Sequence, residues 1–248
     1  MSTAGEVVLD GASRTFHVRA DPGQTLKGAL LRRSKDGGPP PVRALDGVTL
    51  RIEPGETVGI VGRNGAGKTS TLRVLAGIVP LDSGTVEVGG RAVALLELGA
   101  GFGRDFTGRE NILLNGALYG LTREEIEART DDIIAFSELG HFVDVPVRTY
   151  SSGMFVRLGF AIAAYLDADV LLVDEVLAVG DEAFQRKCEQ RIAERVAAGT
   201  TLVLVSHDAG LIERTCARTV VLDAGKVVQD GPTDVAMPFY HRLMGTDG

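Results

Sequence analysis

A glycine-rich loop in the first third of the chain constrains the fold more than any other stretch. The loop covers residues 62–69 and reads Gly-Arg-Asn-Gly-Ala-Gly-Lys-Thr, which is the spacing of a phosphate-binding P-loop. Residues 57–61 before it are apolar and β-branched, as in a buried parallel strand. Residues 68–76 after it have the apolar spacing of a helix. Strand, glycine loop and helix in this order predict a site for a nucleoside triphosphate.

The loop predicts which residues contact the phosphates. Glycines let successive backbone N–H groups turn toward phosphate oxygens, and the helix N-terminus adds its positive end. We expect Lys68 to reach the β- and γ-phosphates and the hydroxyl of Thr69 to bind Mg²⁺. The residues expected to bind the nucleotide here are Gly62, Arg63, Asn64, Gly65, Ala66, Gly67, Lys68, Thr69 and Ser70.

Composition is that of an ordinary globular protein. The chain has 248 residues, 44% of them hydrophobic and 24% charged, which suffices for one large domain. No apolar run reaches the roughly 18 to 20 residues that span a bilayer, and the N-terminus lacks a secretory signal, so we expect a soluble cytoplasmic protein.

The net charge of −7 argues against nucleic acid as the main partner. Cys188 and Cys216 lie on apolar helical faces, which favours buried free thiols over a disulfide.

Strands alternate with helices over most of the chain, which predicts a mainly parallel α/β sheet with an antiparallel portion near the N-terminus. The strands are predicted at residues 6–9, 14–19, 48–52, 57–61, 85–88, 92–98, 170–173 and 201–205, with a hairpin over 220–229. The helices outside the middle of the chain are predicted at residues 68–76, at 182–197 and from about 233 onward.

The middle of the chain reads as helical and interrupts the strand pattern. Residues 107–110 and 122–125 are capping boxes that each open a helix, and a third helix is expected to start near Ser151. We therefore expect a single nucleotide-binding domain over residues 1–248, with a core of about 1–98 and 167–248 and an inserted helical subdomain of about 99–166.

A segment from residue 20 to residue 41 differs in character from its surroundings. Residues 24–31 have the pattern of a short helix with basic residues beside it, and residues 37–41 read Gly-Gly-Pro-Pro-Pro, which breaks regular structure. The segment is interpreted either as a solvated surface insertion or as a docking element for a membrane partner or the anionic leaflet.

Two further strand ends carry the polar groups that a P-loop requires. Asp174 follows an apolar strand, where a carboxylate would hold Mg²⁺ through its water shell. Glu175 comes next and is expected to act as general base or to orient the attacking water. His207 ends the next buried strand, so we expect its imidazole at the same sheet edge, near the γ-phosphate. Lys68, Glu175 and His207 are the predicted catalytic residues.

A short loop before the strand of residues 170–173 identifies a family. Tyr150-Ser151-Ser152-Gly153-Met154 stands where the nucleotide-binding domain of an ABC transporter carries its signature loop, which reads L-S-G-G-Q in most members. Ser152 and Met154 depart from that form, but a serine hydroxyl and N–H groups at a helix N-terminus still make an anion site. The chain thus resembles an ABC transporter ATPase, with a P-loop NTPase core and a helical subdomain.

Variant motifs narrow the resemblance. The stretches at residues 95–102, 107–111, 150–154 and 173–181 are similar to the ATPase subunits of bacterial polysaccharide exporters, which export O-antigen, teichoic acid and related lipid-linked glycans. No glutamine stands at the position of the Q-loop, where Glu97 or Leu98 is the nearest match. The aromatic residue that stacks on adenine would be Phe16, with His17 as the alternative. The chain is expected to lack the C-terminal carbohydrate-binding domain that some O-antigen exporters carry.

The resemblance implies ATP and Mg²⁺ as cofactors and a head-to-tail homodimer that encloses two ATP molecules. Contacts to the partner's nucleotide would come from Ser151, Ser152, Gly153, Met154 and Asp181. It also implies two copies of an integral membrane permease and a peripheral place on the cytoplasmic face of the membrane. The alternatives are a soluble ABC-type ATPase that acts on ribosomes or DNA, a P-loop kinase, and an ABC subunit for another substrate.

Overall fold

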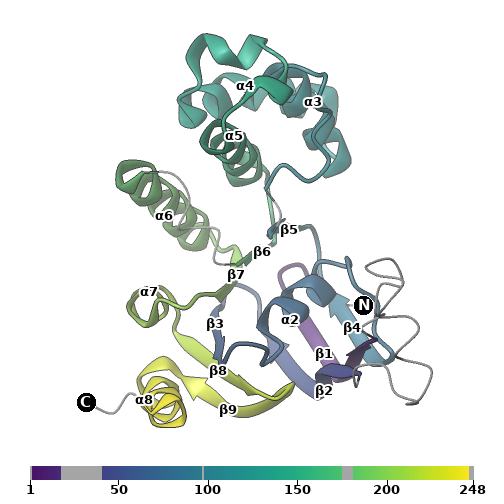
Figure 1. The fold of residues 1–248 in the computed structure, drawn as a ribbon, viewed down its shortest axis with the longest axis vertical. Helices are drawn as coiled ribbons and strands as arrows, with labels where there is room; N and C mark the ends of the chain where they lie inside the picture. The colour runs from purple at the N-terminus through teal and green to yellow at the C-terminus, as the bar shows by residue number, and fades with distance from the viewer. Residues whose placement is uncertain (1, 18–40, 97, 175–180, 246–248) are drawn as a thin grey trace, which may run out of the picture.

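The computed structural model describes residues 2–17, 41–96, 98–174 and 181–245 (Figure 1). In these ranges a six-stranded sheet has the order β5-β6-β7-β3-β8-β9, and a three-stranded sheet has the order β2-β1-β4. A block of helices stands apart from both sheets along the long axis of the molecule. The mainly parallel sheet and the antiparallel portion near the N-terminus are as predicted.

The larger sheet places the P-loop strand at its centre. Its strands are β3 (Thr57–Gly62), β5 (Ala92–Leu95), β6 (Val170–Val173), β7 (Thr201–Val205), β8 (Arg218–Asp223) and β9 (Lys226–Pro232). Strand β3 pairs in parallel with β7 on one side and with β8 on the other. Strands β5, β6 and β7 continue the parallel arrangement, while β8 and β9 form the predicted antiparallel hairpin.

The smaller sheet is antiparallel and consists of β1 (Val7–Phe16), β2 (Val42–Ile52) and β4 (Ser83–Val88). Two separate strands were expected at residues 6–9 and 14–19, and this expectation is wrong, since one strand runs through. Gly11 has a φ of +57° and the pairing register shifts on both sides of Ala12, so β1 bulges but keeps pairing with both neighbours. The polar break in the sequence marks a bulge and not a turn.

Four of the helices pack around the sheets. They are α2 (Lys68–Leu75), α6 (Glu182–Ala197), α7 (Ala209–Thr215) and α8 (Thr233–Met244). Helix α7 was not predicted, because its seven residues are too few to show a clear apolar period. Helices α6 and α8 begin at the predicted residues.

The helical block contains α3 (Gly108–Leu118), α4 (Arg123–Ser137) and α5 (Ser152–Tyr165), with short 3₁₀ turns at Gly140–Asp144 and Val147–Thr149. Both predicted capping boxes are present, because Thr107 and Thr122 each accept from the N–H of the glutamate three residues on, which in turn accepts from the cap's own N–H. Among the described residues, no helix combines the length and apolar character needed to cross a bilayer.

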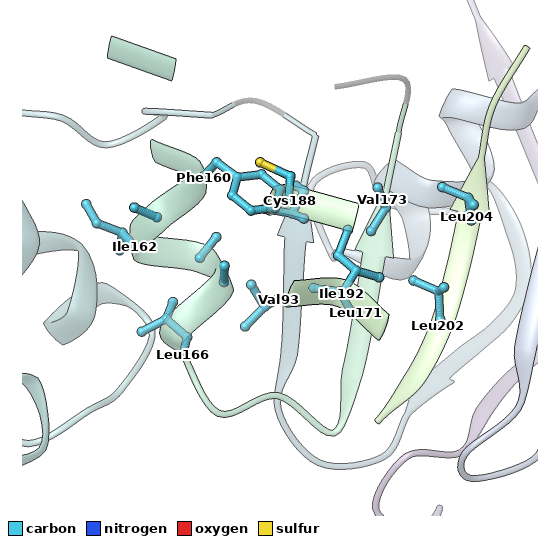
Figure 2. Close-up of a cluster of buried hydrophobic side chains, with 14 of the residues drawn as sticks. Val93, Phe160, Ile162, Leu166, Leu171, Val173, Cys188, Ile192, Leu202 and Leu204 are labelled. Carbon is cyan, nitrogen blue, oxygen red and sulfur yellow. The ribbon is translucent and has the colours of Figure 1, made fainter. Parts of the chain in front are cut away.

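The larger sheet is buried on both faces, which explains its continuous apolar strands. Alternate residues of one strand enter two different cores, so that Leu171 and Val173 face one side while Val170 and Leu172 face the other. Figure 2 shows the first side, where Phe160 of α5, Leu166 just after α5 and Ile192 of α6 pack over β5, β6 and β7. The second side packs against α2 and the smaller sheet.

Some boundaries differ from those expected. The strand predicted at residues 92–98 is shorter, since β5 ends at Leu95, and β2 begins at Val42, six residues before the predicted start at 48. The short helix expected at residues 24–31 lies outside the described residues.

Candidate nucleotide-binding site

Two glycines of the P-loop are required by close backbone packing. Gly67 caps α2 with a φ of +107°, and a Cβ there would lie 2.3 Å from the carbonyl oxygen of Ala44 in β2. A Cβ on Gly62 would lie 2.2 Å from the carbonyl oxygen of Leu222 in β8. The loop is therefore held between the backbones of two strands, and no larger residue fits at either position.

The loop opens onto a cavity of about 290 Å³ that four separate segments of the chain line together. The lining residues are Phe16, Val42, Ala44, Asn64, Gly65, Ala66, Gly67, Lys68, Thr69, Ser70 and His207. Most of the nucleotide-binding residues expected from the sequence thus share one cavity. Val42 and Ala44 were missed, because they lie in the part of β2 that precedes its predicted start and carry no chemical signal of their own.

Lys68 is buried at the base of the cavity, with 6% of its surface exposed. Its Nζ donates to the carbonyl oxygens of Gly62 at 2.8 Å and Arg63 at 3.2 Å. Neither of these two residues lines the cavity, and the guanidinium of Arg63 donates instead to the carbonyl oxygen of Leu243 in α8 at 2.6 Å. Lys68 is therefore fixed to the loop on which the phosphates would rest.

Phe16 lies at the end of β1 and forms one wall of the cavity. The guanidinium of Arg14 lies 5.1 Å from the centroid of its ring and also contacts Asp82 at 2.8 Å. A half-buried aromatic ring at the mouth of a phosphate loop offers a surface on which a base can stack. The alternative aromatic residue, His17, is exposed and is not among the lining residues.

The ends of three neighbouring parallel strands place the predicted polar groups at one edge of the sheet. The P-loop follows β3, His207 comes just after β7, and Asp174 follows β6 directly. Residues that follow parallel strands meet at the same edge. His207 reaches the P-loop cavity, and Asp174 is half-buried at the end of its strand. Glu175 lies outside the described residues, as does Glu97.

Thr69 and Asp174 are the oxygen donors expected to hold Mg²⁺. Thr69 is exposed at the second position of α2 and lines the cavity. Among the described residues, no group of three or more His, Cys, Asp or Glu side chains could hold a metal. The oxygens of Thr69 and Asp174 fit Mg²⁺, which uses one or two protein oxygens together with substrate phosphates and water. They would not suit a metal that requires a complete protein cage.

The signature loop precedes a well-capped helix. Ser151 is the N-cap of α5, and its Oγ accepts from the N–H of Met154 at 3.2 Å. Ser151 and Ser152 are exposed, while Gly153 and Met154 are half-buried. Figure 1 shows α5 in the helical block, separated along the long axis from α2 and the P-loop. None of residues 151–154 is among the residues that line the cavity of the chain's own phosphate loop.

Asp181 is the N-cap of α6, and its Oδ1 accepts from the N–H of Phe184 at 2.9 Å. This hydrogen bond, together with the guanidinium of Arg157, holds the pKa of Asp181 below its ordinary value. Asp181 is therefore ionised at neutral pH, with most of its side chain exposed. Leu98, the other candidate for the Q-loop position, packs against the apolar core.

A glycine loop between a central parallel strand and a helix, with an imidazole and a carboxylate at the same sheet edge, defines a P-loop nucleotide-binding protein. Residues 45–178, more than half of the chain, match the family model described as ABC transporter.

Several proteins resemble this chain over most of its length. The O-antigen export system ATP-binding protein RfbB of Myxococcus xanthus is 46% identical over 96% of this chain and 56% of its own length. The RfbB protein of Klebsiella pneumoniae is 43% identical over 81% of this chain and 82% of its own length. The teichoic acids export ATP-binding protein TagH of Lactiplantibacillus plantarum is 40% identical over 81% of this chain. The chain spans little more than half of the Myxococcus and Lactiplantibacillus proteins.

Solved structures share the fold. An ATP-binding subunit of an ABC transporter superimposes with a TM-score of 0.74 over 98% of this chain, at 22% identity. A dimeric ATP-binding cassette in a post-hydrolysis state with ADP and phosphate superimposes with a TM-score of 0.73 over 92% of this chain, at 20% identity. The chain belongs to the ABC transporter family.

Proposed function

We propose that the chain is the ATP-hydrolysing subunit of an ABC transporter that powers export of a lipid-linked polysaccharide across the cytoplasmic membrane. The proposal that the chain binds ATP rests on the cavity that is lined by Phe16, the P-loop and His207. The polysaccharide, which would be O-antigen, teichoic acid or another cell-wall glycan, is supported by relatives named as O-antigen and teichoic acid export proteins.

Different residues of the cavity would bind the base and the triphosphate of the nucleotide. Adenine would stack on Phe16 at the mouth, and the triphosphate would rest on the backbone N–H groups of the loop, at the N-terminus of α2. Lys68, already turned toward the loop, would direct its ammonium to the β- and γ-phosphates. These contacts explain binding without explaining hydrolysis.

Hydrolysis requires a water molecule in line with the bond from the γ-phosphorus to the bridging oxygen. Water forms a new bond to the γ-phosphorus as that bond breaks, which yields ADP and phosphate. Glu175, next after Asp174 in the chain, would orient this water and accept its proton. His207, which lines the cavity, would hold the γ-phosphate and the water in place. Thr69 and Asp174 would hold Mg²⁺, which supplies positive charge beside the phosphates when bound.

The second half of the site would come from another copy of the chain. The exposed N-terminus of α5, with Ser151 as its cap, would be an anion site, and α5 lies in the helical block, separated along the long axis from the chain's own P-loop. A two-fold dimer would place it, together with Ser152, Gly153, Met154 and Asp181, against the partner's ATP. Two ATP molecules would then be enclosed between two chains, and neither chain would hydrolyse ATP alone.

The transporter would contain two copies of a membrane permease, to which the dimer binds from the cytoplasmic side. This arrangement makes the chain a peripheral protein, held at the membrane by the permease.

We also propose that the domain divides into a core of about residues 1–98 and 167–248 and a helical subdomain of about 99–166. The division is supported by α3, α4 and α5, which form a block of their own beside the sheets.

The Glu175→Gln variant tests ATP hydrolysis and the dimer together. We expect it to bind ATP normally, to lose turnover by at least about 10²-fold, and to elute as a dimer with ATP and as a monomer with ADP. A Lys68→Ala variant is the matched control and is expected to bind ATP weakly and to stay monomeric. A Glu175→Gln protein that remains a monomer with saturating Mg²⁺ and ATP would contradict the enclosed-nucleotide dimer.

The transported substrate needs a separate test with the membrane subunit present. Vesicles that contain the chain, its permease and a lipid-linked glycan should show ATP-dependent movement of the glycan and a rise in ATP turnover. The same vesicles with the Glu175→Gln variant are the control. Turnover that is stimulated by ribosomes or DNA, and not by the permease and glycan, would favour the soluble ABC-type ATPase instead.

A further inference from the structure

We propose that Arg157 is a positioning residue that fixes the signature loop and Asp181 relative to each other, so that both reach the partner's nucleotide together. The proposal rests on the ATP-enclosing dimer described above. Arg157 lies in α5, between one and two turns after the cap Ser151. Asp181 caps the following helix, α6. The two segments come from different elements, and Arg157 contacts Asp181 from the helix that Ser151 caps.

The guanidinium of Arg157 contacts two carboxylates from two different elements. Its Nη1 donates to Oε2 of Glu138 at 2.7 Å, and its Nη2 donates to Oδ2 of Asp181 at 2.6 Å. Its side chain is 20% exposed, so the guanidinium is largely shielded from water. A planar guanidinium with donors on both branches can hold two carboxylates at once, whereas an ammonium acts as a point charge.

A cluster of three phenylalanine rings packs beside these ion pairs. Phe136 of α4, Phe160 of α5 and Phe184 of α6 have ring centroids between 5.8 and 6.2 Å apart. The guanidinium of Arg157 lies 4.6 Å from the centroid of Phe184, which adds a cation–π contact. The end of α4, the start of α6 and the middle of α5 thus converge on one small apolar cluster, and Arg157 covers it at the surface.

Glu138, the other carboxylate that Arg157 contacts, is held in place by a second cation. It ends α4 with a φ of +57°, which is unusual for a residue other than glycine. Its carboxylate accepts from Lys187 at 2.9 Å as well as from Arg157, and Lys187 also donates to the carbonyl oxygen of Phe136 at 3.0 Å. Two cations therefore hold the end of α4 against α5 and α6.

The consequence is geometric. Asp181 and Ser151 are both exposed and both predicted to meet a partner chain, so any change in their relative position would misalign the second half of the nucleotide site. Moving one without the other would break the contact between Arg157 and Asp181. A misplacement of about 1 Å in a reacting assembly can lower the rate by about 10²-fold.

The test compares Arg157→Ala, Arg157→Lys and a control, Arg186→Ala. Arg186 lies on α6 and forms an exposed ion pair with Glu182, so its removal also deletes a surface arginine near Asp181. Each variant is measured for kcat and KM for ATP, for binding of a fluorescent ATP analogue to the monomer, and for the melting temperature. The fraction of dimer with ATP is measured after each substitution is combined with Glu175→Gln.

We expect Arg157→Ala to lower kcat about tenfold or more and to weaken dimer formation, with KM and monomer binding changed by less than about twofold. Arg157→Lys should recover part of the loss, because a lysine can contact one of the two carboxylates. Arg186→Ala should behave as the wild type. An Asp181→Asn substitution should have little further effect in the Arg157→Ala background, because the two residues act as a pair.

Two results would overturn the assignment. The first is an Arg157→Ala protein with wild-type kcat and wild-type dimer formation. The second is a proportional loss of monomer ATP binding, melting temperature and kcat in both Arg157 variants, which would make the residue merely structural. A Glu175→Gln parent that does not dimerise with ATP would instead contradict the proposed function, and the positioning role would fall with it.

Discussion

The guanidinium of Arg14 lies 5.1 Å from the centroid of the Phe16 ring and also forms an ion pair with Asp82. Asp82 accepts from the backbone N–H of Thr15 at 2.6 Å as well, so the end of β1 is fixed from both its backbone and its side chains. A ring held in this way at the mouth of the P-loop cavity is a preformed surface for a base.

The Phe16→Ala substitution should therefore weaken ATP binding by about 5- to 150-fold, which corresponds to about 1–3 kcal/mol of stacking. We expect a higher KM with little change in kcat, because the ring contacts the base and not the reacting phosphate. Titration with a fluorescent ATP analogue measures the affinity directly. His17→Ala is the matched control, since His17 is exposed and does not line the cavity, and equal effects of the two would remove Phe16 from the site.

The Ser151→Ala substitution separates helix capping from anion binding. Loss of the bond from the N–H of Met154 should lower the free energy of unfolding by about 1 kcal/mol. Thr122→Ala deletes the equivalent cap of α4 and should cost a similar amount. Chemical denaturation measures both changes.

Only Ser151→Ala should also reduce ATP turnover and ATP-dependent dimer formation, because only that cap is expected to face a partner's phosphate. A Thr122→Ala protein with the same loss of turnover would show that the effect comes from stability alone.

The two thiols should be inert in the folded protein. Burial raises the pKa of Cys188 and of Cys216 to about 12, and both side chains are nearly inaccessible. At pH 8 each thiolate should be about 10³-fold scarcer than in the unfolded chain. We expect a thiol reagent at pH 8 to label neither residue until denaturant is added. Rapid labelling of one thiol in native buffer would show that its helix opens locally.

Glu138 should contribute to stability in a way that depends on pH. Lys187, through its hydrogen bond, and Arg157 hold the pKa of Glu138 below its usual 4.5 in the folded state. A lowered folded-state pKa stabilises the protein above the unfolded pKa, and the gain is lost as the pH falls through the folded-state value. Glu138→Gln should thus be less stable than the wild type at pH 7, by about 0.5 kcal/mol because the side chain is half-exposed.

The difference between Glu138→Gln and the wild type should begin to shrink below about pH 4.5 and vanish at lower pH, as urea denaturation at a series of pH values would measure. Glu127→Gln, which deletes a more exposed pair within α4, is the control and should change stability less. A gap between Glu138→Gln and the wild type that persists at pH 2 would have a cause other than the carboxylate charge.

Elements whose signals are local were predictable from the sequence. The capping boxes at Thr107 and Thr122 locate two helix starts within a residue, because the cap is satisfied by groups three positions away. The strand β7 and the helix α6 have the predicted bounds, since continuous apolar residues and a four-residue apolar period are unambiguous over those lengths. Pairing between distant segments was harder, because the bulged course of β1 depends on strands β2 and β4.

The sequence by itself determined that a P-loop lies between a buried strand and a helix, and that an acidic pair and a histidine follow later strands, because backbone and side-chain chemistry at those points is local. Tertiary structure alone decided that Val42 and Ala44 complete the cavity, since β2 is placed there by its pairing with β1 and by its packing against the P-loop. It also decided that Arg157 joins Asp181 to the helix of Ser151. The end of α4 and the start of α6 must meet beside α5 before one guanidinium can contact both carboxylates, and no spacing along the chain encodes that meeting.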